Sequence, residues 1–97
     1  MQWSAVISID SATYPLSVVQ KSAYVLADSL SILIRQTSDE FVLTVEPSDP
    51  SAALTEAAAR VVLTRTLNDF ALRDQVFKET AGIREILART ALKGAGF

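Results

Sequence analysis

Apolar and polar residues alternate in three short stretches in the first half of the chain. The stretches 3–9, 29–35 and 41–45 each carry apolar residues at every second position, which is the period of a β-strand with one buried face. Pro47 ends the third stretch, because proline cannot donate a hydrogen bond to a neighbouring strand. The polar link 36–40 between the second and third stretches is short, so we expect them to form an antiparallel hairpin.

Three other segments repeat their apolar residues at helical spacing. We place the first helix at about 15–28, where a proline occupies the first turn. Ser48-Asp49-Pro50-Ser51 combines capping side chains with a proline, so it predicts the start of a long helix at about 51–79. We expect Thr80-Ala81-Gly82 to break or bend this helix, and a last helical stretch to occupy 83–92.

The order of these elements, β-α-β-β-α-α, predicts a small α+β protein. A right-handed crossover after the first strand and a hairpin after the second put the third strand in the middle of the sheet. The expected fold is a three-stranded split β-α-β sheet, like a truncated ferredoxin-like fold, with the helices on one face. The chain of 97 residues allows a single domain, 1–97. The strands and the first helix occupy 1–47, and the long and C-terminal helices occupy 50–93.

The helix predicted at 51–79 has more apolar positions than one buried face needs. One stripe contains Leu63, Leu67, Phe70 and Phe77, and a second contains Leu54, Ala58, Val61, Leu72 and Val76. A helix that covers a small sheet needs a single apolar face somewhat wider than ~100°. The second stripe therefore needs a cover of its own, which is the C-terminal helix folded back, a second copy of the chain, or another protein.

A polar line separates the two stripes and consists of Arg65, Asn68, Asp69 and Arg73. Both arginines lie four residues from Asp69, so both can reach its carboxylate on one helix face. The simplest interpretation is a solvated ladder of ion pairs, each worth about 0.3–0.5 kcal/mol. Asn68 favours a second interpretation, because asparagine is a mediocre residue in the middle of a helix. Its amide can instead bond the backbone of a partner.

The composition excludes much of enzyme chemistry. The chain contains no Cys and no His, which removes disulfides, zinc fingers, iron–sulfur clusters, thiol catalysis and acid–base catalysis by histidine. With only three glycines it has no glycine-rich phosphate loop. A hydrophobic content of 49% is typical of a folded chain rather than a disordered one. We expect a folded protein that is not an enzyme, with no catalytic residue, metal site or cofactor.

The charge and the apolar runs bear on partners and location. Residues 1–50 hold two basic and six acidic side chains, whereas residues 51–97 hold seven basic and five acidic ones. The net charge of −2 argues against binding to nucleic acid or to an anionic membrane. No apolar run approaches the ~20 residues needed to span a bilayer, and the first residues do not have the pattern of a signal peptide. We expect a cytoplasmic protein.

One segment of the long helix resembles a known signature. Residues 66–74 read Thr-Leu-Asn-Asp-Phe-Ala-Leu-Arg-Asp, similar to the Leu-Leu-Asn-Asp-Tyr-x-Leu-Arg-Glu signature of HxsD, a small protein of the His-Xaa-Ser peptide-modification system. Thr66, Phe70 and Asp74 depart from the signature, although Phe70 keeps the aromatic shape and Asp74 keeps the charge. Other segments similar to the family are Lys21-Ser22-Ala23-Tyr24, Glu79-Thr80 and Gly82-Ile83-Arg84.

The resemblance implies a bacterial accessory protein that works beside two radical-SAM proteins and a precursor peptide with His-Xaa-Ser repeats. The radical enzymes of such a system need an iron–sulfur cluster on three Cys, which this chain lacks. We therefore expect a binding module that contacts these maturases or the precursor peptide. The candidate partner-binding residues are Asn68, Asp69, Phe70, Arg73 and Asp74. The possible interface residues around them are Arg65, Leu72, Val76 and Arg84.

Two alternatives remain open at the level of sequence. The chain could capture a peptide as an added strand along a sheet edge, which the first and second strands would provide. It could also be a structural homo-oligomer, for which a long helix with two apolar stripes is suited. In that case Asn68, Asp69 and Arg73 form bonds within the chain and serve its own fold.

Overall fold

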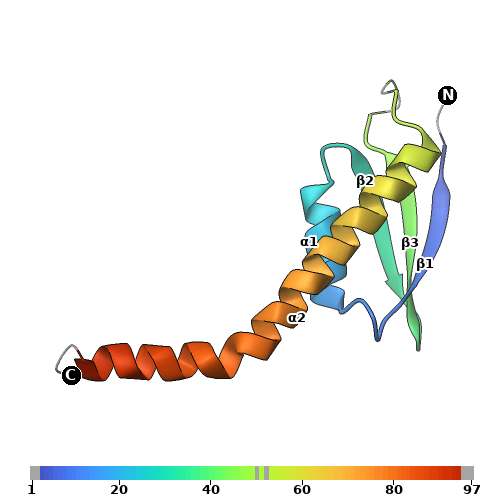
Figure 1. The fold of residues 1–97 in the computed structure, drawn as a ribbon. Helices are drawn as coiled ribbons and strands as arrows, with labels where there is room; N and C mark the ends of the chain where they lie inside the picture. The colour runs from blue at the N-terminus through green and yellow to red at the C-terminus, as the bar shows by residue number, and fades with distance from the viewer. Residues whose placement is uncertain (1–2, 50, 52, 95–97) are drawn as a thin grey trace.

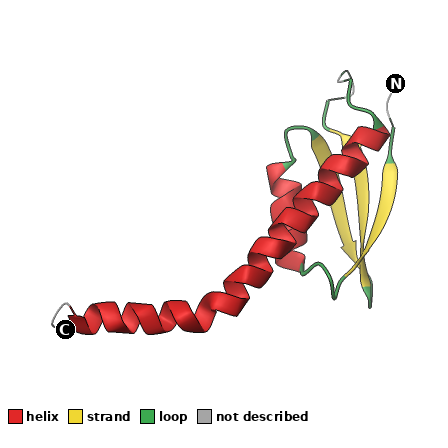
Figure 2. Cartoon of the chain, viewed as in Figure 1, coloured by secondary structure: helices red, strands yellow, loops and turns green. Residues whose placement is uncertain are grey.

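The protein folds as a sheet covered on one face by two helices (Figure 1). The computed structural model describes residues 3–49, 51 and 53–94, with side chains of the C-terminal helix described as far as residue 83. The elements in chain order are β1 (Ala5–Asp10), α1 (Leu16–Val25), β2 (Leu30–Gln36), β3 (Glu40–Pro47) and α2 (Glu56–Gly94). The helices lie on one side of the three strands (Figure 2), which confirms the expected α+β class.

The middle strand of the sheet is β3. The strands are ordered β1-β3-β2, and both outer strands pair with β3 in antiparallel register. Ile7 and Ile34 both lie opposite Leu43, so the three side chains form one apolar row across the sheet. The hairpin between β2 and β3 and the crossover through α1 confirm the predicted split β-α-β arrangement.

The core lies between this sheet and the inner faces of both helices. Its buried residues are Val18, Val19, Leu30, Phe41, Leu43, Val45, Ala59, Leu63 and Leu67. Ser22 is also buried, and its hydroxyl donates a hydrogen bond of 2.8 Å to the carbonyl of Val18. The indole Nε1 of Trp3 donates to the carbonyl of Leu54 at 2.8 Å. This bond ties the start of β1 to the loop before α2.

The other face of the sheet has no helix over it among the described residues. Val6 and Leu33 are exposed there on the two outer strands, and Thr44 lies opposite both of them on β3. Small and polar residues surround this pair, as the alternating pattern predicts. The face is therefore mixed in character rather than a second core.

The start of α2 differs from the prediction, since the helix begins at Glu56 rather than near residue 51. The hydroxyl of Thr55 accepts a hydrogen bond of 3.1 Å from the amide of Ala58, which is the bond of an N-cap. Leu54 consequently lies outside the helix, where it packs against the core. Its assignment to the second apolar stripe of the helix was wrong.

The capping residues that suggested the earlier start close a local turn instead. The Asp49 carboxylate accepts hydrogen bonds from the amide and the hydroxyl of Ser51, at 3.0 and 2.7 Å. These two bonds hold the pKa of Asp49 below its ordinary value of 3.8. Aspartate that bonds the backbone two residues on favours a turn as readily as a helix cap.

The long C-terminal element is a single helix of 39 residues. Thr80-Ala81-Gly82 were expected to break or bend this helix, and the break is wrong, because the helix continues through these residues and the order is β-α-β-β-α. The helix does change direction in its C-terminal half (Figure 1). The hydroxyl of Thr80 donates to the carbonyl of Val76 at 2.9 Å, and such a bond bends a helix slightly.

The C-terminal part of α2 extends away from the sheet (Figure 1). The radius of gyration is 18.2 Å, whereas a compact domain of this length has about 12–13 Å. The longest dimension is 64 Å against 31 and 17 Å for the other two. The C-terminal residues therefore do not fold back over the long helix, and this candidate cover for the second apolar stripe is excluded.

Candidate partner-binding surfaces on the two helices

The segment 66–74 lies wholly within α2, and its side chains point to different sides of the helix. Leu67 is buried against the sheet and anchors the helix. The remaining members take part in three surfaces. These are a cleft beside the β1–α1 loop, a groove beside α1, and a stripe on the side of α2 that faces away from the sheet.

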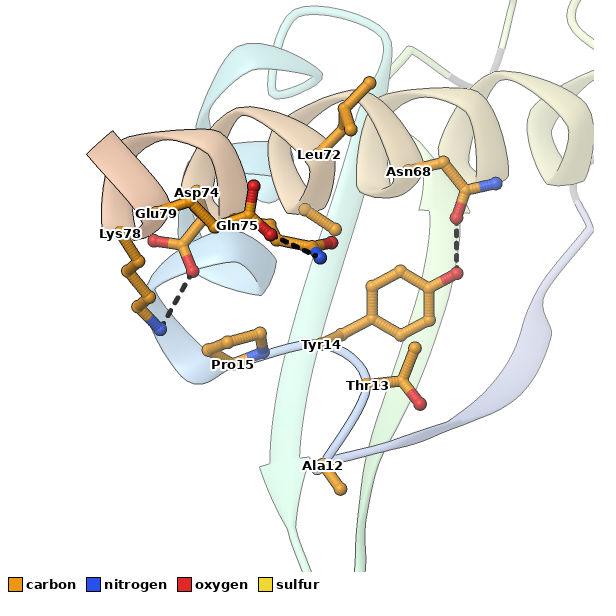
Figure 3. Close-up of a pocket in the computed structure, with 11 residues that line it drawn as sticks. Ala12, Thr13, Tyr14, Pro15, Asn68, Leu72, Asp74, Gln75, Lys78 and Glu79 are labelled. Carbon is orange, nitrogen blue, oxygen red and sulfur yellow. Dashed lines mark hydrogen bonds and ion pairs between the residues drawn. The ribbon is translucent and has the colours of Figure 1, made fainter. Parts of the chain in front are cut away.

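The first surface, the loop cleft, has a volume of about 450 Å³ and lies between α2 and the loop at residues 12–15. The hydroxyl of Tyr14 donates a hydrogen bond to Oδ1 of Asn68 across the cleft (Figure 3). The ring of Tyr14 is half-buried and packs against the core. Asn68, which the sequence assigned to partner binding, therefore joins the β1–α1 loop to α2 within the chain.

The other polar groups of the loop cleft are paired along α2. Asp74 forms an ion pair of 3.1 Å with Lys78, and Gln75 donates to Glu79 at 3.2 Å (Figure 3). Over the described part of the chain, acidic side chains do not gather in groups of three or more that could hold a metal ion.

The second surface, which we call the aromatic groove, runs between α1 and α2 around the half-buried ring of Phe70. Tyr24 and Val25 of α1 form one end with Phe70, enclosing a volume of about 500 Å³. Lys21 and Phe77 meet Phe70 at the other end, where the volume is about 320 Å³. Tyr24 is 84% exposed, so the groove presents aromatic surface directly to solvent.

Charged side chains line the aromatic groove. The guanidinium of Arg73 lies 5.8 Å from the centre of the Phe70 ring and forms an ion pair of 3.1 Å with Asp69. The expectation that Arg65 also reaches Asp69 is wrong, because Arg73 is the one basic side chain that pairs with Asp69 among the described residues. Within the described residues Arg65 and Lys21 both line the groove without an ion pair. The groove thus has an aromatic floor and a surplus of positive charge.

The third surface, which we call the outer stripe, lies on the side of α2 opposite its buried residues. Each residue of a helix is turned by about 100° from the last, which places Val61, Leu72, Val76 and Ile83 on one side. All four are exposed, and Leu72 retains 61% of its surface. Leu72 and Val76 were predicted interface residues, and the structure leaves them uncovered. Arg84, the remaining predicted interface residue, lies outside the residues whose side chains are described.

Among the described strands β1 and β2 are the two edges of the sheet, so capture of a peptide by strand addition stays a prediction. No helix in the described ranges combines the length and the apolar character needed to cross a membrane.

A family model described as His-Xaa-Ser system protein HxsD matches residues 9–97. The chain belongs to the HxsD family. The match spans both helices, and so includes the loop cleft, the aromatic groove and the outer stripe. Membership associates the chain with the His-Xaa-Ser system and confirms the resemblance found in segment 66–74. Neither the curated proteins nor the solved structures gave a match.

The contribution of α1 to the aromatic groove was not predicted from the sequence. Lys21, Tyr24 and Val25 line the aromatic groove, yet only α2 residues were selected as candidates. The segment Lys21-Ser22-Ala23-Tyr24 had already shown similarity to the family, and that similarity was the available signal. The role of Tyr14 had no local signal, because its partner Asn68 is 54 positions away.

Proposed function

We propose that this chain is a non-catalytic accessory protein of the His-Xaa-Ser system that docks a helix of a radical-SAM maturase in its aromatic groove. The observation that carries the proposal is the exposed aromatic surface between α1 and α2. Tyr24 and Phe77 are both largely exposed there, on either side of Phe70. Apolar surface of this kind, bordered by polar residues, commonly marks a site of protein interaction.

The shape of the groove suits an amphipathic helix. Two packed helices leave a furrow into which a third helix places residues from one face. Aromatic side chains such as Tyr24 and Phe70 supply large contact area with few rotatable bonds, and such residues dominate binding energy. Arg73, already stacked on Phe70, offers further N–H donors to the incoming segment.

The charge of the groove indicates an acidic partner. Lys21 and Arg65 lack ion pairs within the described residues, although the whole chain carries a net charge of −2. The positive surplus is therefore local to the groove. A carboxylate on the docked helix would pair with Lys21, and complementary charge speeds association and selects the partner.

The same chemistry favours a maturase over the precursor peptide. A His-Xaa-Ser repeat offers imidazoles and hydroxyls, whereas the groove selects apolar anchors and carboxylates. The chain has no Cys or His with which to hold a radical cluster or transfer protons. We therefore assign the reaction to the partners and binding to this chain.

Co-purification tests the proposal. The tagged chain is mixed separately with each of the two radical-SAM proteins and with the precursor peptide, and the dissociation constant of each complex is measured. The groove variant combines Tyr24→Ala with Lys21→Glu, which removes the aromatic anchor and reverses one charge. Leu33→Ser is the matched control, because Leu33 is 69% exposed on the opposite face of the sheet.

We expect one maturase to bind the wild-type chain and the Leu33→Ser variant equally. The groove variant should bind it at least tenfold more weakly, since removal of an aromatic anchor costs about 2 kcal/mol. Equal binding by the groove variant would contradict the site. Binding of the precursor alone would contradict the choice of partner, and turnover by the isolated chain would contradict the non-catalytic role.

A further inference from the structure

The outer stripe of α2 is an unpartnered surface distinct from the aromatic groove. Besides its four apolar residues Val61, Leu72, Val76 and Ile83, the same side of the helix carries three polar ones, Arg65, Asn68 and Glu79. They follow one another at intervals of three and four residues, which keeps them on one side of a helix. Leu63 and Leu67, on the opposite side, are buried against the sheet. The helix therefore presents a second face whose apolar side chains are exposed, while Asn68 at its edge is bonded to Tyr14 in the loop cleft.

The extent of α2 adds a reason why this face needs a cover. The helix continues to Gly94, beyond the part that packs on α1 and the β1–α1 loop (Figure 1). Isolated helices shorter than about 12–15 residues are marginal in water. Ile83 lies on the extended part and is 60% exposed. A partner along the outer stripe would support both the packed and the extended parts of the helix.

The sequence of the outer stripe is complementary to itself. The positions at equal distances on either side of Leu72 are Asn68 and Val76, Arg65 and Glu79, and Val61 and Ile83. Two antiparallel helices related by a twofold axis at Leu72 bring Arg65 of one copy beside Glu79 of the other, once at each end. Both positions precede Thr80, and so lie on the part of α2 before the extended one.

The charges at these positions are available for such a pairing. Arg65 has no ion pair within the described residues. Glu79 accepts a hydrogen bond from Gln75 on its own helix, and its carboxylate has further acceptor sites. Two Arg65–Glu79 pairs would therefore form in such a dimer and would fix its register.

We infer that a second copy of this chain packs antiparallel along the outer stripe, with Leu72 at the twofold axis. The inference goes beyond the proposed function and does not depend on it. The sheet and α1 lie on the far side of each α2, so the two bodies stand on opposite sides of the helix pair. Phe70 and Phe77 face α1 rather than the partner copy, which leaves the aromatic groove accessible. The small number of apolar contacts indicates a weak, concentration-dependent dimer.

Cysteine cross-linking tests the register directly, because the chain contains no Cys. In Leu72→Cys the single thiol lies at the twofold axis, so mild oxidation should give a disulfide-linked dimer at micromolar protein concentration. Tyr24→Cys, with its thiol in the aromatic groove, is the matched control and should remain mostly monomeric. Equal cross-linking of the two variants would overturn the inference.

Sedimentation equilibrium tests the charge pairs. Arg65→Glu should weaken dimerisation at least tenfold, because it places two carboxylates together at each end of the stripe. Adding Glu79→Arg should restore the wild-type dissociation constant, since the pairs are then reversed. Circular dichroism checks that each variant keeps its helix content. A wild-type chain that stays monomeric at all concentrations, or a double variant that is not restored, would overturn the proposed pairing.

Discussion

The hydrogen bond between Tyr14 and Asn68 allows a quantitative test of what the 66–74 segment does for the fold. Tyr14→Phe removes the donor but keeps the ring, which packs against the core. Asn68→Ala removes the acceptor and also raises helix propensity, so neither single variant isolates the bond. A double-mutant cycle with both changes cancels these side effects.

The magnitude follows from the surroundings of the bond. A neutral hydrogen bond contributes about 0.5–1.5 kcal/mol to stability. Tyr14 is half-buried but Asn68 is exposed, so water competes for the amide. We expect a coupling free energy of about 0.5–1 kcal/mol. For a domain of this size 1 kcal/mol corresponds to roughly 4–8 °C in Tm.

Urea denaturation of the four chains, followed by circular dichroism, measures the coupling. All four are compared at one low protein concentration, because self-association would raise apparent stability. Additivity of the two single changes to within about 0.3 kcal/mol would refute a structural role for Asn68. That result would return Asn68 to the set of residues available for a partner.

Three further predictions concern the two ends of α2 and the turn before it. Thr55→Ala should lower the free energy of unfolding by about 1 kcal/mol, since it removes the N-cap. Ser51→Ala should leave the helix content by circular dichroism unchanged. A larger loss of helix from Ser51→Ala than from Thr55→Ala would place the start of α2 elsewhere. Gly82→Ala should stabilise the helix by about 0.5–1 kcal/mol and so raise its helix content, because an added methyl group meets no atom within 4 Å. A loss of helix signal by circular dichroism would contradict this. The pKa of Asp49 is lowered in the fold from 3.8, so the stability that its carboxylate contributes is present above that pH and is lost as the pH falls through the lower folded pKa. Asp49→Asn should therefore flatten this part of the acid unfolding curve. An unchanged curve would show that the bonds of Asp49 to Ser51 do not contribute to stability.

The sheet was predictable from sequence because the pattern that specifies each strand lies within the strand itself. Alternation of apolar residues at every second position located all three strands, and the short link between the second and third fixed the hairpin. Connection rules then placed β3 in the middle. The start of α2 was not predictable in the same way, because Asp49 can cap a helix or close a turn. The indole of Trp3 bonds the carbonyl of Leu54, 51 positions away, and no local pattern signals so distant a contact.

The direction of the C-terminal part of α2 also could not be predicted from the sequence. Apolar spacing shows that a helix has a second apolar face, but the same spacing suits a helix that folds back and one that extends away. The helix continues through Gly82, because one glycine costs a long helix only about 1 kcal/mol. That continuity leaves the outer stripe exposed.

The candidate site was predicted in part. The segment 66–74 was located correctly on the long helix, and the structure places Phe70, Arg73 and Asp69 together at the aromatic groove. It separates Asn68 from them by turning it to Tyr14. The partner-binding role of the groove residues stays a prediction. Residues of α1 completed the groove, and the packing of the two helices shows that the family-like segment Lys21-Ser22-Ala23-Tyr24 lies beside Phe70.

The most direct test of the central claim is to map the surface that a maturase covers. The isotopically labelled chain is titrated with the unlabelled maturase, and changes in amide signals are followed by NMR. We expect the largest changes at Lys21, Tyr24, Val25 and around Phe70, the residues of the aromatic groove. Changes confined to the open face of the sheet around Leu33 would contradict it.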